Sequence, residues 1–170
     1  LYLSPIILQA GWNKFVSFEN TVYWFEHSLN MPFPTILAAL ATGTELLGGL
    51  LLLLGLAIQF ITLPLMIVML VAAFTVHWQN GWLAISDASS WLANERVLEA
   101  VDKKERVVAI LQEHGHYEWL TSSGTVTILN NGIEFAITYF IMLLALFMLG
   151  AGRFVSIDYW VTKKANLVAK

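Results

Sequence analysis

The stretch that decides the fold is residues 33–57, FPTILAALATGTELLGGLLLLLGLA, in which Glu45 is the only charged residue. A helix that crosses the hydrocarbon core of a bilayer needs about 20 mostly apolar residues. Three further runs of apolar residues follow or precede this stretch, and the first of them along the chain is the shortest. The pattern predicts an all-α fold, a four-helix transmembrane bundle with spans at about 1–18, 33–57, 60–78 and 126–150.

The composition excludes several other classes of protein. Hydrophobic residues make up 58% of the chain and charged residues 12%, whereas soluble domains carry about 25% charged residues. Nine Lys and Arg stand against twelve Asp and Glu, so no nucleic-acid partner is expected. The absence of cysteine excludes a disulfide, a thiolate metal site and a cysteine nucleophile. Because the chain starts with Leu, we expect upstream residues to be missing, and a signal peptide is not expected.

Basic residues near the span ends predict the orientation, because Lys and Arg concentrate on the cytoplasmic side. The C-terminal tail holds four basic residues and one acid, namely Arg153, Lys163, Lys164, Lys170 and Asp158. We therefore expect a multi-pass membrane protein with both termini in the cytoplasm. Residues 1–170 then form a single transmembrane domain, in which residues 83–125 are an extracytoplasmic insertion.

The insertion contains a predicted amphipathic helix over residues 91–113. Apolar residues recur at helical spacing between charged ones, at Leu98, Val101, Val108 and Leu111. Charge pairs four residues apart, such as Glu99 with Lys103, stabilise a helix. The segment is too polar to cross a bilayer, so we expect it to lie on the outer surface or to cap the bundle.

Polar side chains within the apolar spans are the candidates for function. A carboxylate at the bilayer centre costs about 2.5–3.5 kcal/mol on insertion scales, so it usually faces other helices or a cavity. Glu45 and Glu134 are the carboxylates concerned, and they are the candidate proton-handling groups. The predicted topology brings polar residues of four spans into the outer half of one bundle: Lys14, Glu45, His77, Asn131 and Glu134.

Two interpretations of these residues are open at this point. In the structural one, hydrogen bonds worth about 0.6–2 kcal/mol each set the register of the helices. Lys14 would then neutralise Glu45 or Glu134. In the functional one, the residues line a polar pocket that holds a small head group or passes protons.

Metal binding and catalysis have little support in the motifs. His114 and His116 form an i,i+2 pair, and imidazole suits copper or zinc, but this spacing alone is a weak signal. No other metal site is predicted. The chain has no phosphate-binding glycine loop, no Gly-x-Ser-x-Gly motif and no His-Glu-x-x-His motif. Whether the protein is an enzyme is left open.

Three motifs resemble those of the DoxX-like integral membrane proteins. Gln9-Ala10-Gly11-Trp12-Asn13-Lys14 resembles the end of that family's first helix, and Gly43-Thr44-Glu45-Leu46-Leu47-Gly48-Gly49 resembles its second helix. Thr75-Val76-His77-Trp78-Gln79-Asn80-Gly81-Trp82 is similar to the end of its third helix. The longer insertion is most similar to the members encoded beside the biosynthesis of copper-related modified peptides. The resemblance implies a four-helix inner-membrane protein with cofactor-binding candidates at Lys14, Glu45, His77 and Asn80.

Some relatives of this family are linked to redox chemistry, among them a small subunit of thiosulfate:quinone oxidoreductase. The resemblance therefore implies an accessory subunit of a redox process that binds a quinone in the polar pocket. A second hypothesis is a non-catalytic assembly subunit, whose partners are other membrane proteins besides the lipid bilayer. A third is a metal-handling or carrier protein that uses His114 and His116.

Overall fold

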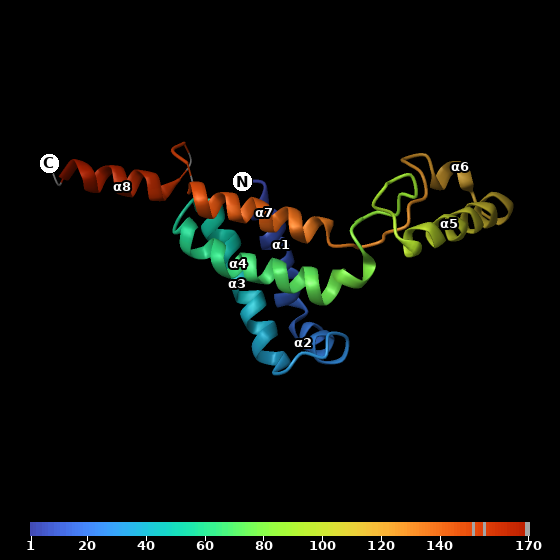
Figure 1. The fold of residues 1–170 in the computed structure, drawn as a ribbon, viewed down its shortest axis with the longest axis horizontal. Helices are drawn as coiled ribbons and strands as arrows, with labels where there is room; N and C mark the ends of the chain where they lie inside the picture. The colour runs from blue at the N-terminus through green and yellow to red at the C-terminus, as the bar shows by residue number, and fades with distance from the viewer. Residues whose placement is uncertain (151, 155, 169–170) are drawn as a thin grey trace. The chain divides into compact units, whose positions relative to one another are not determined.

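A computed structural model describes residues 1–150, 152–154 and 156–168 of the chain. The described residues fold into helices joined by loops, without a strand, as Figure 1 shows. They divide into two compact units, of which unit 2 comprises Ala72–Ile137 and unit 1 the rest. The all-α prediction is therefore confirmed for the described residues. Lys170, expected in the basic tail, lies outside them.

Each unit contains its own set of helices. Unit 1 holds α1 (Leu3–Val16), α2 (Phe18–His27), α3 (Pro34–Leu54), α4 (Ile58–Val71), most of α7 (Glu134–Leu149), and α8 (Ile157–Val168). Unit 2 holds the π-helical turn η1 (Ala72–His77), the 3-10 turn η2 (Trp78–Asn80), α5 (Glu95–His114) and α6 (Tyr117–Leu120).

Two helices among the described residues are long and apolar enough to cross a membrane. They are α3, with 21 residues, and the continuous helix Ile58–Asn80, with 23 residues. The helices α1 and α7 have 14 and 16 residues, which correspond to about 21 and 24 Å at 1.5 Å per residue. Both are shorter than the roughly 30 Å hydrocarbon core of a bilayer. The structure thus supports membrane helices in general, and the four-span bundle stays a prediction.

The helix boundaries differ from the predicted spans at two places. The first predicted span corresponds to α1, which ends at Val16, and a further helix that was not predicted, α2, starts at Phe18. The fourth predicted span forms α7, which starts at Glu134 rather than near residue 126. Residues 126–133 form a loop rather than a helix because their backbone bonds to another loop: Leu129 forms an isolated antiparallel bridge with Ile85, and the Asn130 N–H donates to the Ala84 carbonyl. The first two turns of the helix predicted over residues 126–150 are therefore absent, and the backbone there pairs with the loop at Ile85 instead.

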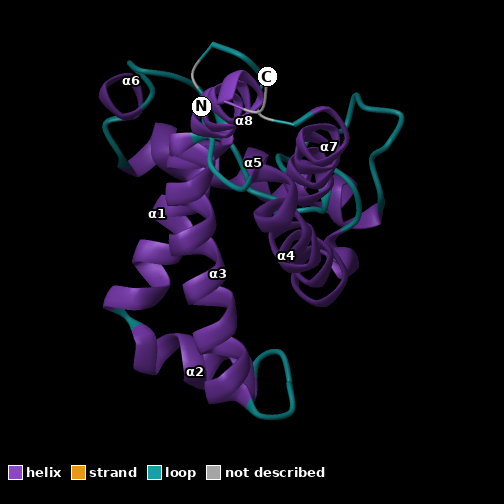
Figure 2. Ribbon diagram, turned by 90° about the vertical axis from the view of Figure 1, so that its left-hand side faces the viewer, coloured by secondary structure: helices purple, strands orange, loops and turns teal. Residues whose placement is uncertain are grey.

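Helices α1 and α3 lie side by side in unit 1, as Figure 2 shows, because glycines at their contact leave room. A Cβ atom on Gly49 would lie 2.6 Å from Leu8 Cγ, and one on Gly11 would lie 2.9 Å from Glu45 Cβ. The Ser4 hydroxyl uses this close approach and donates a hydrogen bond of 2.6 Å to the Gly49 carbonyl. Small residues at helix contacts are how membrane helices pack when lipid supplies no hydrophobic drive between them.

An apolar core joins four helices of unit 1. Its side chains come from α1, α3, α4 and α7 and are nearly excluded from solvent: Leu3, Ile7, Leu52, Ile58, Ile61, Leu65, Met66, Met69 and Leu143. The turn between α3 and α4 includes Gly55 at φ 63°, a left-handed conformation that costs glycine least. This core brings the ends of α3 and α4 together with α1 and α7.

The contact between α1 and α3 makes a stability prediction with a control in the same helix. Gly49→Ala should lower the free energy of unfolding by about 1–3 kcal/mol, because its methyl group would overlap Leu8. Gly43→Ala should leave stability unchanged or raise it, because no atom lies within 4 Å of the added methyl. Thermal unfolding in mild detergent measures both variants, and equal melting temperatures would contradict the close α1–α3 packing.

Candidate functional site

A buried ion pair connects the two helices that the glycines bring together. Lys14 lies in the last turn of α1, and Glu45 lies within the apolar helix α3. The Lys14 Nζ and Glu45 Oε2 atoms are 2.6 Å apart, as a hydrogen-bonded salt bridge. The Glu45 side chain is 4% exposed, whereas that of Lys14 is 25% exposed. The structure therefore selects Glu45 as the partner of Lys14.

The local sequence explains why the pair forms here. Gly11 precedes Lys14 by three residues, so both lie on the same face of α1. With no side chain at Gly11, the backbone of α1 comes so near α3 that a Cβ there would lie 2.9 Å from the Leu46 nitrogen. The lysine, one turn later, then reaches the carboxylate of Glu45. In the motif Gly11-Trp12-Asn13-Lys14, the glycine thus allows α1 to approach α3 closely, and the lysine supplies the cation for Glu45.

The pair is chemically able to bind a polar group. A lysine ammonium has three donors, and Glu45 accepts one of them. Lys14 is the partly exposed member of the pair. The exposed aromatic rings of Trp12 and Phe15 flank it in sequence, with centroids 5.8 Å apart. The pair thus places a partly exposed lysine side chain beside a buried carboxylate.

The other predicted polar residues gather in unit 2, around Asn130. The Asn130 side chain is buried and donates to two backbone carbonyls, at 2.8 Å to Asn80 and 2.6 Å to Leu83. Its Oδ1 atom accepts a hydrogen bond of 3.2 Å from Arg96 Nε. Asn94, which caps the first turn of α5, also donates to the Asn80 carbonyl. The sequence predicts Asn131 as a site candidate and not its neighbour Asn130, because the partners of Asn130 are backbone groups of distant residues.

The predicted residues of unit 2 bond to backbone atoms. His77 Nδ1 lies 2.8 Å from the Asn131 carbonyl oxygen, and the Asn80 side chain donates to the same oxygen at 3.0 Å. Glu134 Oε2 accepts from the backbone N–H of Ala84 at 2.9 Å. These contacts join residues 77–84 to residues 130–134. They agree with the structural interpretation for this group, in which polar side chains hold backbone segments together.

Gly132 shows how closely these two segments approach. A Cβ atom there would lie 2.5–2.6 Å from the carbonyl oxygens of Gly81, Trp82 and Leu83. Its own N–H donates to the Leu83 carbonyl at 3.0 Å. Any side chain at this position would separate the segments and break the bonds of Asn130.

The predicted site residues therefore form two groups. Lys14 and Glu45 contact each other in unit 1, and the contacts of His77, Asn80, Asn131 and Glu134 lie within unit 2. The pocket predicted for all six residues stays a prediction.

The predicted metal candidates lie on an exposed part of unit 2. His114 and His116 flank the exposed Gly115, and His114 Nε2 lies 3.6 Å from Glu113 Oε1. The described part of the chain contains no group of three His, Asp or Glu residues that could hold a metal ion.

Comparison with known proteins supports the family resemblance over part of the chain. The sequence model of the DoxX family matches residues 1–78, which include both members of the ion pair and His77. The resemblance is thus confirmed for this part. No curated protein matches the chain, and neither does any solved structure. Membership of the subgroup encoded beside copper-related peptide biosynthesis stays a prediction.

A double-mutant cycle tests the coupling between Lys14 and Glu45. Lys14→Met should lower the free energy of unfolding by about 2–4 kcal/mol, because it leaves the Glu45 carboxylate buried without its cation. The double variant Lys14→Met/Glu45→Gln should recover part of this loss, since no unpaired charge remains. Unfolding in mild detergent of the unaltered protein, the two single variants Lys14→Met and Glu45→Gln, and the double variant provides the three free-energy changes of the cycle.

The matched control is the exposed pair of Lys103 and Glu99 on α5, whose atoms are 3.1 Å apart. The same cycle there should give a coupling of only a few tenths of a kcal/mol, as for exposed pairs one helical turn apart. Similar coupling energies for the two pairs would show that burial adds nothing to the pair of Lys14 and Glu45.

The cluster around Asn130 makes a separate prediction for unit 2. Asn130→Ala should lower stability by about 1–3 kcal/mol, because the Asn80 and Leu83 carbonyls lose their donor. Gln112→Ala, at an exposed position of α5, should have little effect. Hydrogen exchange of the amides in residues 77–84 and 130–134 locates the loss, and unchanged protection there would contradict the proposed role of Asn130.

Proposed function

We propose that this chain, which matches the DoxX family over residues 1–78, is a four-span protein of the bacterial inner membrane and an accessory subunit of a quinone-linked redox process. In this proposal α1, α3, the helix Ile58–Asn80 and α7 cross the membrane. Both termini are cytoplasmic, and residues 83–125 lie on the outer side. The lipid bilayer and a redox protein of the same membrane are the partners.

The observation that supports the proposal is the ion pair inside a candidate span. Glu45 follows Pro34 by eleven residues, which is about 17 Å along a helix whose 21 residues extend about 32 Å. A charge at this depth is costly and usually marks a functional path or a binding site. Lys14 reaches it from the end of α1 and keeps a quarter of its side chain accessible.

The chemistry of a quinone fits this pair. A quinone ring presents two carbonyl oxygens that accept hydrogen bonds, and the partly exposed Lys14 can donate to one of them. Reduction to the hydroquinone takes two electrons and two protons, one for each ring oxygen; the carboxyl group of Glu45 can pass one proton to and from the nearer oxygen, and water supplies the other. The electrons come from the redox partner.

Binding of a short-chain ubiquinone to the purified protein in nanodiscs tests this function. We expect Lys14→Met and Glu45→Gln each to weaken quinone binding by about ten-fold or more, because each variant loses a charge-assisted hydrogen bond to the quinone. Lys14→Arg keeps the pair and should bind with an intermediate affinity. Lys103→Met removes an equal charge from the exposed helix α5 and should bind as the unaltered protein does.

The folded state of each variant is checked by its melting temperature before binding is measured. Equal affinity of Lys14→Met and the unaltered protein would exclude the pair from quinone binding. Co-purification of a stable membrane partner without any quinone would favour the assembly-subunit hypothesis instead.

A further inference from the structure

The beginning of α8 is bonded to the turn between α3 and α4. The Asp158 carboxylate accepts the backbone N–H groups of Ala57 and Ile58 at 2.9 and 3.0 Å. In the opposite direction, the Asp158 N–H and the Ser156 hydroxyl donate to the Gly55 carbonyl at 3.1 and 3.0 Å. Four hydrogen bonds therefore hold α8 at the end of both candidate membrane spans.

These hydrogen bonds occupy the negative charge of Asp158, so the charges that the tail exposes are mainly positive. Asp158 is the only acid after Glu134, and its carboxylate lies at the N-terminus of α4, where backbone N–H groups and the helix dipole favour an anion. The basic residues Arg153, Lys163 and Lys164 are exposed. The described surface of this end of the chain is consequently cationic.

An apolar face of α8 lies beside these cations. Ile157, Trp160 and Val161 follow the i, i+3, i+4 spacing of one helix face and are 39, 56 and 60% exposed. The Lys163 ammonium lies 5.2 Å from the Trp160 ring centre. An exposed apolar face with tryptophan and lysine is the pattern of helices that lie in the headgroup layer of a membrane.

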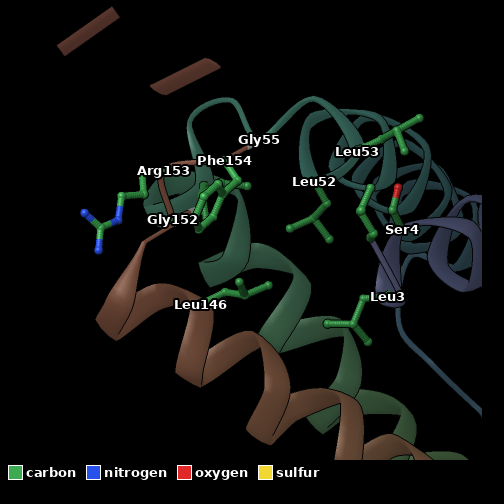
Figure 3. A pocket seen from close by; sticks show the side chains of 11 residues that line it. Leu3, Ser4, Leu52, Leu53, Gly55, Leu146, Gly152, Arg153 and Phe154 are labelled. Atoms are coloured by element: carbon green, nitrogen blue, oxygen red, sulfur yellow. The ribbon is translucent and has the colours of Figure 1, made fainter. Parts of the chain in front are cut away.

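A hollow beside the anchored segment adds an apolar wall. It has a volume of about 260 Å³ and includes Leu3, Leu52, Leu146 and Phe154 in its lining, with Arg153 at its edge. In Figure 3 the Arg153 guanidinium points away from the leucines. A phospholipid would place acyl carbons against the leucines and its phosphate near the guanidinium.

We propose that α8 and Arg153 bind anionic phospholipid head groups, with α8 lying along the membrane surface at the α3–α4 end of unit 1. An anionic lipid is the expected ligand for three reasons. The surface is cationic, the exposed face of α8 is apolar, and α8 is bonded to the turn between two candidate membrane helices. The inference rests on the proposed membrane insertion of α3 and α4. It does not depend on the quinone.

The absence of cysteine allows a single environment-sensitive label at a chosen position. Val161→Cys, carrying a nitrobenzoxadiazole group, is reconstituted as the full chain into vesicles of phosphatidylcholine alone or with about 30% phosphatidylglycerol. We expect the label to be quenched by acrylamide about three-fold less in the anionic vesicles. Lys163→Gln/Lys164→Gln, which keeps only Arg153 among the described basic residues of the tail, should remove most of this difference, because each basic residue near such a surface contributes about five-fold to binding.

Two controls make the outcome decisive. Lys103→Gln/Lys104→Gln removes the same charge from α5 and should keep the protection of the label. Ile67→Cys, an exposed position of α4, should be shielded from acrylamide in both lipid mixtures if α4 crosses the membrane. An exposed label at Ile67→Cys would refute the membrane insertion itself.

With the label at Ile67→Cys shielded, two results would overturn the lipid proposal alone. One is equal quenching of the Val161→Cys label in both lipid mixtures. The other is protection that survives Lys163→Gln/Lys164→Gln. Protection that requires an added acidic protein rather than anionic lipid would also overturn it.

Discussion

A carboxylate inside an apolar helix needs a cation, and this requirement organises unit 1. Glu45 lies near the middle of α3, and Lys14 supplies the cation from α1. The lysine can reach it only because Gly11 lets the two helices approach closely. Gly49, further along α3, permits the same closeness against Leu8. The ion pair and the glycine contacts therefore depend on each other: wider spacing would leave Glu45 buried without its partner.

Unit 2 uses its polar residues in another way. Asn130 bonds to the carbonyls of Asn80 and Leu83, and Gly132 allows the segments to touch. Buried backbone groups need partners as much as charges do, and in irregular loops side-chain amides often supply them. The same polar residue types thus have different uses in the two units. In unit 1 they neutralise a buried charge, and in unit 2 they close loops whose backbone lacks helical hydrogen bonds.

Particular residues show how far prediction from the sequence reached. The sequence predicts that Glu45 is shielded from lipid by other helices, because the residues around it are apolar. It also predicts that Lys14 neutralises either Glu45 or Glu134. In the structure Lys14 pairs with Glu45. Asn130 and Asp158 were missed as contacts because their partners are backbone groups of distant residues. Backbone donors and acceptors are the same at every residue, so no sequence pattern marks them.

The sequence by itself determined the class of protein and the general position of its helices. Burying a long apolar run away from water is favourable whatever its neighbours are, so such a run predicts a membrane or core helix without knowledge of its contacts. Only the tertiary structure decided which polar groups pair, where α1 and α7 end, and how α8 bonds to the α3–α4 turn. Hydrogen bonds and ion pairs act over about 3 Å, so they depend on distances between chain segments that local composition does not encode.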